Sequence, residues 1–590
     1  MSCLALSIFL VGIFFWGSAI PSDSFPHRIT EYVSICDIQG DGFVSPYVGK
    51  KLRTRGVVTL DLEETGKHGF FMQDENCDRR GKTSDGIYIY HQEVINLVQP
   101  GDRIEVQGYV NEYYGLTEII SLPEDILLLS SGNPLPMSLE LSPPFESQES
   151  RKYYESREGM MVSLSEALAV GPTDADDRNW LIRSDLGLGR VFQGDPAGIG
   201  EIICVDDRGI FKINPDLKVG ARVNGLQGAL DFSYSDYCVQ LSVAPVVVPD
   251  DSKKTTGKLD EETEPTFTIA TFNLNDLFDT VDDPYTDDTR LSPTEYQRRL
   301  QKRAMVIHEQ LGEPDLIAVQ EAENMEVLLA LASRPEIQST YQFLLLDGPD
   351  THGIDVGFIY KPDRFQLLEF GAYQGCTTLI DGLGPDGNQD VHNPQNVITC
   401  DTDADGIADG NRLFSRPPLV VKLRANFGIQ DDFWLVNNHW KSKAEDTDAT
   451  EFTLPRRLGE AQFLSNLTEE IRISEGGANL IILGDLNDFP NSQPLSLLTD
   501  EGFFDITQNI DSSNRYTYIY HGISQVLDYI LLNKASTLNP LAVIPIHINA
   551  DYPYRLSMDE TTFHRSSDHD PLIVQFSMPG YQAYLPIIRR

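Results

Sequence analysis

The stretch LIILGDLND, residues 480–488, opens with a short apolar run that predicts a buried β-strand and continues directly into a polar turn. That turn carries Asp485, Asn487 and Asp488. Alternating α/β folds place their sites at the carboxyl ends of strands, so these side chains are candidates for chemistry. Taken alone, however, an Asp-x-Asn sequence after a strand is more often an ordinary turn.

The same arrangement recurs along the C-terminal half of the chain, where short apolar strands are bordered by carboxylates, amides or histidines. Chance turns and helix caps do not explain such recurrence within one domain, so we expect the bordering residues to converge. They are Asn273 after the strand at 267–272, Gln320 and Glu321 after 316–319, His439 after 433–436, Asp528 within 527–532, and Asp568 and His569 before 572–576.

Helices are predicted between these strands, which makes residues 266–578 an α/β domain. One helix is predicted from Ser292, a cap residue followed by Pro293 in the first turn, to about Leu311. Residues 579–590 form a tail beyond the last predicted strand, and the sequence does not decide its role.

The N-terminal half has a different texture. Residues 28–132 contain short strands separated by Gly and Pro at the spacing of a small β-barrel. Residues 158–249 repeat this plan loosely, since 219–225 is similar to 98–104. We therefore expect two small OB-like barrels, followed by a polar linker at 250–265 and then the α/β domain.

The polar motifs of the α/β domain together resemble the endonuclease/exonuclease/phosphatase superfamily. Its members include deoxyribonucleases, abasic-site endonucleases, sphingomyelinases and inositol polyphosphate phosphatases. Barrels placed before such a domain resemble the order found in large extracellular bacterial nucleases. The motifs occur in the family's order, at 271–273, 317–321, 438–439, 484–487, 527–529 and 567–571.

This resemblance implies a four-layer sandwich of two facing sheets flanked by helices. It also implies a divalent metal ion bound by Glu321, with Asn273 and Asp568 close by. Oxygen ligands of this kind suit Mg²⁺ or Mn²⁺. Such an ion stabilises charge that develops on a phosphate and helps to form the nucleophile.

The resemblance further implies roles in hydrolysis. Asp485 and Asn487 would position the attacking water and a phosphate oxygen, and Asp528 would orient His569. His569 and His439 would form a proton-transfer pair, because imidazoles titrate near neutral pH. Which histidine acts as base or phosphate stabiliser, and which as acid, stays open.

The expected substrate is DNA, with RNA as a further candidate. Arg416 lies in a segment similar to one in deoxyribonucleases whose arginine contacts the scissile-strand phosphate, and abasic-site enzymes lack the equivalent of His439. Lys441 adds positive charge for a phosphate backbone. The net charge of −43 argues the other way, because nucleic-acid-binding surfaces carry an excess of Lys and Arg.

Two rival functions remain open. The chain could be a phosphoesterase of the same superfamily that acts on nucleotides, sphingomyelin or phosphoinositides. It could also be a non-catalytic surface or matrix binding protein, although such a protein has no need of both histidines. Barrel aromatics such as Phe70, Tyr88 and Tyr114 are candidates for stacking on bases, but most aromatics in small barrels fill the core.

The chain begins with an apolar run at 4–16 that ends in small residues, which predicts a cleaved signal peptide at 1–19 rather than an anchor. No later segment is apolar enough to cross a membrane, so we expect a secreted protein without stable membrane insertion. Buried thiols are one alternative for its cysteines, but export favours one disulfide per domain. The economical pairs are Cys36–Cys77, Cys204–Cys238 and Cys376–Cys400.

An acidic segment at 401–410, DTDADGIADG, has the spacing of a calcium loop. Alternating carboxylates can wrap one ion, and Gly406 permits the sharp turn. Arg412 occupies the position where an EF-hand has Glu, so a solvated acidic loop is the alternative. The predicted Ca²⁺ ligands are Asp401, Asp403, Asp405 and Asp409.

Overall fold

The computed structural model describes residues 31–74, 77, 82–93, 96–207, 212–250, 266–284, 286–379, 399–403, 405–427, 432–447 and 450–577. The predicted signal peptide, the predicted linker beyond residue 250 and the predicted tail lie outside these residues. Within the described part of the chain, no helix is long and apolar enough to span a membrane.

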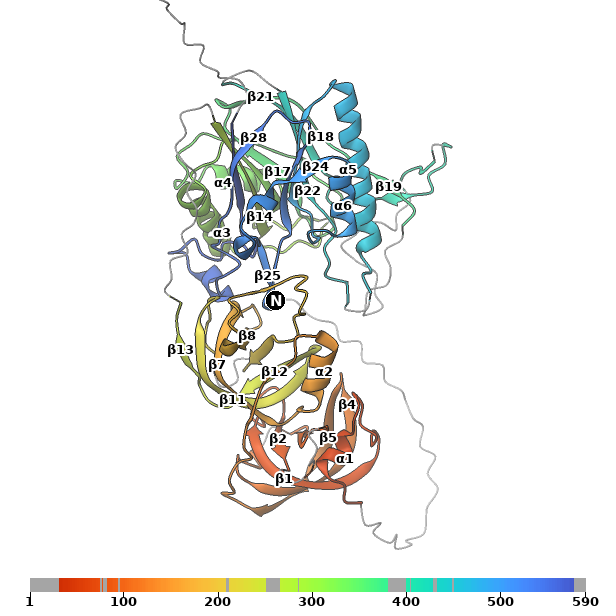
Figure 1. Ribbon diagram of the computed structural model, residues 1–590, viewed down its shortest axis with the longest axis vertical. Coiled ribbons are helices and arrows are strands. Elements are labelled where there is room, and N and C mark those ends of the chain that lie inside the picture. The colour runs from red at the N-terminus through yellow and green to blue at the C-terminus, as the bar shows by residue number, and fades with distance from the viewer. Residues whose placement is uncertain are drawn as a thin grey trace, which may run out of the picture.

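The chain is multidomain, as predicted, and consists largely of β-sheet. Three bodies follow one another along the long axis of the molecule: a first β unit, a second β unit and the α/β domain (Figure 1). Their order along this axis is their order in the sequence, so the second β unit lies between the other two.

The first β unit is a closed five-stranded barrel in the order β1-β2-β3-β5-β4. In β1, buried and more exposed residues alternate, which is the pattern of a strand with one face on a core. Strands β3 and β5 pair in parallel. Its elements are α1 (Ile35–Gln39), β1 (Lys51–Asp61), β2 (Gly69–Gln73), β3 (Gly86–Tyr90), β4 (Arg103–Tyr113) and β5 (Leu116–Ser130).

The second β unit repeats this topology. Its strands form a ring in the order β7-β8-β10-β12-β11, because β11 pairs with both β12 and β7, and β10 and β12 are parallel. The loose repeat seen in the sequence is therefore a repeat of strand order. The elements are β6 (Leu139–Glu140), α2 (Ser147–Glu155), β7 (Met161–Gly171), β8 (Asn179–Arg183), η1 (Ser184–Leu186), β9 (Val191–Phe192), β10 (Ile203–Asp206), β11 (Arg222–Ser233), β12 (Asp236–Leu241) and β13 (Val246–Val248).

The α/β domain contains two six-stranded sheets. The first has the order β16-β17-β15-β14-β29-β28 and the second the order β18-β21-β22-β23-β27-β24. The strands of the first sheet are β14 (Thr266–Leu277), β15 (Leu316–Ala322), β16 (Gln342–Leu345), β17 (Asp355–Tyr360), β28 (Asn539–Pro545) and β29 (Leu572–Ser577). Those of the second are β18 (Phe365–Ala372), β21 (Leu419–Ala425), β22 (Asp432–His439), β23 (Asn479–Asp485), β24 (Phe503–Asp505) and β27 (Asp528–Asn533).

Helices and short strands complete this domain. The helix predicted from Ser292 begins as α3 (Pro293–Met305), with the Ser292 hydroxyl accepting from the amide of Glu295, and widens into a π-turn (Val306–Gln310). The other elements are α4 (Met325–Ala332), β19 (Cys376–Thr377), β20 (Asn411–Arg412), α5 (Leu454–Ser474), α6 (Gln493–Asp500), η3 (Ile506–Asn509), η4 (Ser512–Asn514), β25 (Tyr518–Tyr520), β26 (Ile523–Gln525) and η5 (Tyr554–Met558).

Three apolar clusters hold the α/β domain together. The first combines residues of both sheets, such as Leu316 and Leu435, so the sheets face each other. The second lies between the first sheet and α3 and α4, and the third between the second sheet and α5 and α6. Figure 1 shows α3 and α4 on one side of the sheets and α5 and α6 on the other. Because both sheets are packed on two sides, their strands are held firmly and their ends are well positioned.

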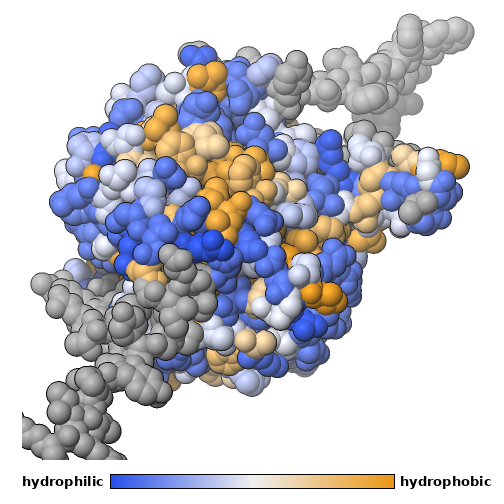
Figure 2. Space-filling view, turned by 90° about the horizontal axis from the view of Figure 1, so that it is seen from above, coloured by the Kyte–Doolittle hydropathy of each residue, from blue (hydrophilic) through white to orange (hydrophobic). Residues whose placement is uncertain are grey.

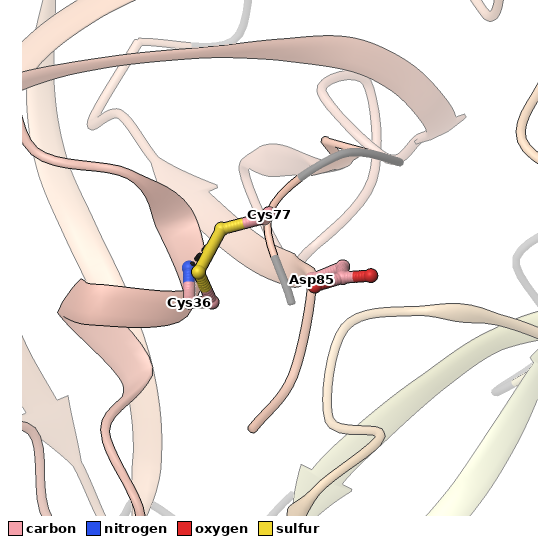
Figure 3. A group of neighbouring side chains, drawn as sticks. All are labelled: Cys36, Cys77 and Asp85. Atoms are coloured by element: carbon pink, nitrogen blue, oxygen red, sulfur yellow. Dashed lines mark hydrogen bonds between the residues drawn. A yellow bond between two sulfur atoms is a disulfide. The ribbon is translucent and has the colours of Figure 1, made fainter. Parts of the chain in front are cut away.

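Three disulfides join the predicted cysteine pairs. Cys204 and Cys238 are direct neighbours in the β10–β12 pairing. Figure 3 shows the disulfide that joins Cys36, in α1, to Cys77, with Asp85 nearby and extending away from the sulfur atoms. These three residues lie close enough together to hold a metal ion. The sulfur atoms of the two cysteines are bonded to each other, however, so they are not available as thiolate ligands.

The aromatic residues of the first barrel are divided between core and surface. Phe70 and Phe71 are fully buried and Tyr88 is 2% exposed, so these three rings fill the core. Tyr114 is 85% exposed.

At the opposite end of the molecule, the surface of the α/β domain is mainly hydrophilic around a central apolar area (Figure 2).

Candidate active site

The ends of strands from both sheets meet because amide side chains link the sheets. Gln320, at the end of β15, donates to the side-chain oxygen of Asn437 in β22 at 2.7 Å. Asn437 in turn donates to the backbone oxygens of Val319 and Gly357 in the first sheet at 2.9 and 2.8 Å. All these groups are buried, so the hydrogen bonds fix how the two sheets are placed beneath the candidate site.

Glu321 owes its direction to an irregularity in β15. The pairing of β15 with β17 shifts register between Gln320 and Ala322, and Glu321 has φ of 59°. A bulge re-aims the side chain of the extra residue, and a left-handed backbone on a non-glycine residue is strained. The carboxylate accepts from the side chain of Asn273 and from the backbone amide of Asp276, both at 2.8 Å. These two hydrogen bonds hold Glu321 in the strained conformation.

The strand end that carries Asn273 is joined to the segment that carries Asp568. The Asn273 amide donates to Asp485 at 3.2 Å as well as to Glu321. Ser567 donates from its hydroxyl to the backbone oxygen of Asn273 at 2.8 Å, and the same hydroxyl lies 3.5 Å from Asp568. Asn273 and Glu321 are thus in contact, and Ser567 links the segment that carries Asp568 to the backbone of Asn273, but among the described residues Asp568 belongs to none of the groups close enough together to hold one metal ion.

The two histidines converge on one carboxylate. His439 Nε2 and His569 Nε2 each lie 3.8 Å from Asp485 Oδ2. His569 Nδ1 forms a 2.8 Å hydrogen bond with Asp528 Oδ2, so the ring is oriented with Nε2 toward Asp485. His439 Nε2 also lies 3.6 Å from Glu321 Oε1. The structure thus brings His439, His569, Asp485 and Glu321 together.

Asn487 has two contacts that keep it beside this cluster. Its backbone amide donates to Asp485 Oδ1 at 2.9 Å, and its side chain donates to the backbone oxygen of Trp440 at 3.1 Å. Its φ of 48° lies in the left-handed region, where Asn is the most tolerated residue after glycine. The turn after β23 is thus folded back onto the residue that follows His439.

Burial dominates the protonation of the site. It raises the pKa of Glu321 to about 8, aided by Asp276 and Asp568, and raises the pKa of Asp485 to about 7. Burial and the charge of Arg416 hold the pKa of His439 well below its usual range. Burial acts in the same direction on His569, but Asp528 and Asp485 outweigh it and raise its pKa well above the usual range.

The residues present fit a hard divalent cation. Glu321, His439 and Asp485 form one group whose ligand atoms all lie within 4.8 Å of one another, and Asp485, Asp528 and His569 form another. Glu321 and Asp485 are largely buried carboxylates of the first group, and a bound cation would offset the cost of burying their charges. Oxygen donors dominate the set, as Mg²⁺ and Mn²⁺ require.

Gly484 allows the strand before Asp485 to approach β22. Its φ is 121°, and a Cβ at this position would overlap the backbone oxygen of Asn438. We predict that Gly484→Ala destabilises the protein by about 2 kcal/mol or more, since both the backbone conformation and the contact become unfavourable. Chemical denaturation should detect this loss. Gly189→Ala, where an added Cβ meets open space, should leave the unfolding midpoint nearly unchanged.

The predicted substrate-binding cations are turned inward. Arg416 is 8% exposed, donates to Asp350 at 2.8 Å, and reaches the backbone oxygens of Trp440 and His439 at 3.0 and 3.4 Å. Lys441 is 7% exposed, and its ammonium group lies 3.3 Å from Glu445. The geometry favours a role for both in holding the segment after β22. In sequence such buried residues cannot be told from surface ones.

The acidic segment lies apart from this site, between β19 and β20. Asp401, Asp403 and Asp405 form a group with metal-binding spacing, and Gly406 has φ of 89°, as the predicted turn requires. Asp409 instead accepts hydrogen bonds from the backbone amide and hydroxyl of Thr402. The structure thus brings three of the four predicted calcium ligands together.

Several residues near the centre were not identified from the sequence. Asp276, whose amide binds Glu321, also lies 3.2 Å from His352 Nε2. The ring of Tyr518 lies 4.7 Å from that of His569. His352 and Tyr518 stand in segments without a recurrent polar pattern, so no local signal distinguishes them from ordinary loop residues.

Comparison with known proteins assigns families to two parts of the chain. Residues 268–382 match a sequence profile of the Endonuclease/Exonuclease/phosphatase family, and residues 137–251 match that of a domain of unknown function. No curated protein matches the sequence.

Among solved structures, an endonuclease/exonuclease/phosphatase from Bacteroides vulgatus is 14% identical, with 53% of this chain and 100% of that chain covered and a TM-score of 0.34. The mannosyl-6-phosphatase Bt3783 of Bacteroides thetaiotaomicron is 15% identical (53% and 100% covered, TM-score 0.33). TDP2 of D. rerio, complexed with single strand DNA product, is 16% identical (53% and 99% covered, TM-score 0.32).

Proposed function

We propose that this chain is a divalent-metal-dependent phosphodiesterase that cleaves DNA endonucleolytically, with RNA as a further candidate substrate. The proposal is supported by the match of residues 268–382 to the Endonuclease/Exonuclease/phosphatase family. The observation that carries the proposal is the convergence of His439 and His569 on Asp485, beside Glu321 and Asn273. A protein that only binds a ligand has no need of two imidazoles aimed at one buried carboxylate.

Glu321, Asn273 and Asp568 are the proposed ligands of Mg²⁺ or Mn²⁺, and Asp485 is near enough to share the ion. When bound, the cation would stabilise the negative charge that develops on the phosphate and lower the pKa of a water molecule. The Asn273 amide donates to both Glu321 and Asp485 and so holds the two carboxylates near each other. Asp276 supports Glu321 from behind through its backbone amide.

Proton transfer is the proposed work of the two histidines. Asp528 fixes the ring of His569 through Nδ1 and leaves Nε2 facing the centre, from where it can accept or donate a proton. His439 faces the same centre from the other side. Asp485 and Asn487 position the attacking water and a phosphate oxygen. Arg416 acts indirectly, by holding the backbone of His439 and Trp440, and Lys441 pairs with Glu445 in the segment that follows.

The remainder of the chain is proposed to be arranged as in extracellular nucleases. Residues 266–578 form a four-layer sandwich, preceded by OB-like barrels at 28–132 and 158–249, a linker at 250–265 and a signal peptide at 1–19, with a tail at 579–590. Three disulfides support an extracellular location, because such bonds persist in oxidising compartments. Asp401, Asp403 and Asp405 are proposed to bind a structural Ca²⁺, with Asp409 holding the turn.

A cleavage assay tests the proposed function. Purified protein should nick and then linearise plasmid DNA with Mg²⁺ or Mn²⁺ supplied, and EDTA should stop the reaction. An Asp485→Asn protein prepared in parallel should be inactive, which excludes a contaminating nuclease. DNA left intact by the wild-type protein, with a phosphomonoester, a nucleotide or sphingomyelin hydrolysed instead, would replace this proposal by the alternative phosphoesterase.

A further inference from the structure

A pocket of about 280 Å³ lies between the second β unit and the α/β domain, directly beside the candidate active site. Asn275, Ser567 and Asp568 line it on the side of the catalytic cluster. Trp180 and its neighbours in the second β unit form the opposite wall. Its volume is close to the lower end of the range for small-molecule sites, roughly 300–1,000 Å³.

One wall of the pocket is a hairpin that is clamped by the second β unit. Strands β25 and β26 pair through a two-residue turn, His521-Gly522, whose φ values of 47° and 80° are typical of a type I′ turn. Gly522 is packed so tightly that a Cβ would lie 2.9 Å from the Trp180 side chain. Strand β26 also pairs in parallel with β9 of the second unit. The hairpin therefore has one position relative to both bodies.

Further contacts make the junction rigid. Arg190 of the second unit donates to Ser524 at 2.9 Å, to Tyr516 at 2.9 Å and to Asp551 at 2.7 Å, and is almost completely buried. Asp551 belongs to the segment whose Asn549 donates to the backbone oxygen of His569 at 2.7 Å. The second β unit is thus joined by short contacts to the segment that positions a predicted catalytic histidine.

The hairpin carries a stack of aromatic rings. The ring of His521 lies 4.2 Å from that of Trp180 and 4.0 Å from that of Tyr520, at interplanar angles of 14° and 10°. Two nearly parallel rings at these distances must occupy opposite faces of the imidazole. Trp180 is 5% exposed and Tyr520 is 51% exposed. The stack is therefore buried at one end and ends in the pocket with an accessible tyrosine ring.

The two sides of the pocket carry different charged residues. On the second β unit, Asp174 and Asp176 are bound by Arg178, which lies 3.1 Å from each carboxylate. On the α/β domain, Arg565 stands near Asp568 and donates to the backbone oxygen of Asn549 at 3.1 Å. The cation of Arg565 is suited to a phosphate next to the metal ligands, whereas the accessible ring of the pocket, Tyr520, lies on the β25–β26 hairpin.

We infer that this pocket is a subsite for the nucleoside next to the scissile phosphate, with its base stacked on Tyr520 and its phosphate directed toward Asp568. The inference rests on the proposed function and names the part of a nucleic acid strand that the second β unit helps to bind. Stacking on an aromatic ring accepts any base, so the subsite confers a preference for nucleic acid over other phosphodiesters without a strong sequence preference.

The test pairs a change in the protein with a change in the substrate. Single-stranded oligonucleotides carry one phosphodiester among methylphosphonate linkages, so the cleavage position is known. In two further substrates an abasic residue replaces the nucleoside on the 5′ or the 3′ side of that linkage. For the wild-type protein, removal of the base on the subsite side should lower kcat/KM about tenfold.

Tyr520→Ala should lose about tenfold on the complete oligonucleotide and lose nothing more when that base is absent. Tyr520→Phe should retain the wild-type rate because the ring is kept. Tyr373→Ala, which removes a tyrosine of similar exposure (40%) that does not line this pocket, should have no effect. Wild-type cleavage of the complete oligonucleotide reports the proposed function separately.

The outcomes are distinguishable. If the wild type cleaves but Tyr520→Ala loses less than twofold, or if the losses from the two changes multiply, the subsite is wrong while the function stands. If the wild type nicks plasmid DNA but cleaves none of the oligonucleotides under any metal condition, the subsite is overturned while the function stands. If it cleaves neither, the proposed function and the subsite are overturned together.

Discussion

Replacing His569 with alanine is expected to slow phosphodiester cleavage by about 10²-fold or more while leaving the protein folded. His569 Nε2 faces Asp485, the other nitrogen is bound to Asp528 and the ring lies beside that of Tyr518, so the ring is placed for proton transfer. A positioned general acid or base contributes 10²–10⁴-fold. Initial rates on supercoiled DNA, with saturating metal, measure the effect.

A matched control separates chemistry from structure. His308 also pairs with a carboxylate, Glu313, at 2.7 Å, but it lies in the π-turn after α3. His308→Ala should retain the rate within about twofold. Asp528→Asn should fall between the two, because it keeps the shape of the partner but no longer stabilises the imidazolium. A His569→Ala protein with wild-type turnover would remove this residue from the mechanism.

Glu321→Gln is the second change from which we expect a large effect. It removes a charge from the proposed metal site but keeps the acceptor oxygen for Asn273 or Asp276. We expect Mn²⁺ binding, followed by calorimetry, to weaken strongly and the cleavage rate to fall by about 10²-fold or more, since a bound cation supplies several kcal/mol of charge stabilisation. Raising the Mn²⁺ concentration should restore part of the rate.

Glu321→Gln should weaken metal binding, but it is expected to stabilise the folded protein when no metal is bound. Burial raises the pKa of Glu321 from 4.5 to about 8, so the folded state binds the proton more tightly than the unfolded state does. Metal-free wild-type protein should therefore lose stability as the pH rises through this window. Glu321→Gln should reduce this loss, and added Mn²⁺ should reverse it in the wild type.

Glu323→Gln provides the comparison for both measurements. Burial also raises the pKa of Glu323 to about 8, but its carboxylate accepts from the backbone amide of Asp279 and belongs to none of the metal-binding groups among the described residues. The Glu323→Gln substitution should change the pH dependence of stability without weakening Mn²⁺ binding. Equal loss of Mn²⁺ affinity in both variants would argue against Glu321 as a specific ligand.

The strand ends were predictable because buried strands are apolar in sequence, whereas the candidate site residues that follow them are polar. An apolar run such as 480–483 records that a strand is packed on both faces, and the polar residues that follow mark where it leaves the core. The cap at Ser292 and the three cysteine pairs were predictable for the same reason, since each depends on few residues and simple chemistry. The predicted start of this helix also agrees with the first turn of α3.

The direction of individual side chains was not predictable. Arg416 resembles a substrate-binding residue in sequence, yet it is directed inward to Asp350. Glu321 reaches the centre only through a bulge with φ of 59°, and no propensity favours that conformation for glutamate. Phe70 and Tyr88 look like stacking residues but fill the barrel core. Each of these outcomes depends on packing that several distant segments create together.

By itself, the sequence determined the presence of an α/β domain with a carboxylate, amide and histidine set at its strand ends, because strand periodicity and polar interruptions are local properties. Only the tertiary structure decided that both imidazoles meet at Asp485, and that the second β unit closes a pocket beside them. The contact of Arg190 with Ser524 joins residues 334 positions apart. Such contacts arise from the packing of whole domains, and no short stretch of sequence records them.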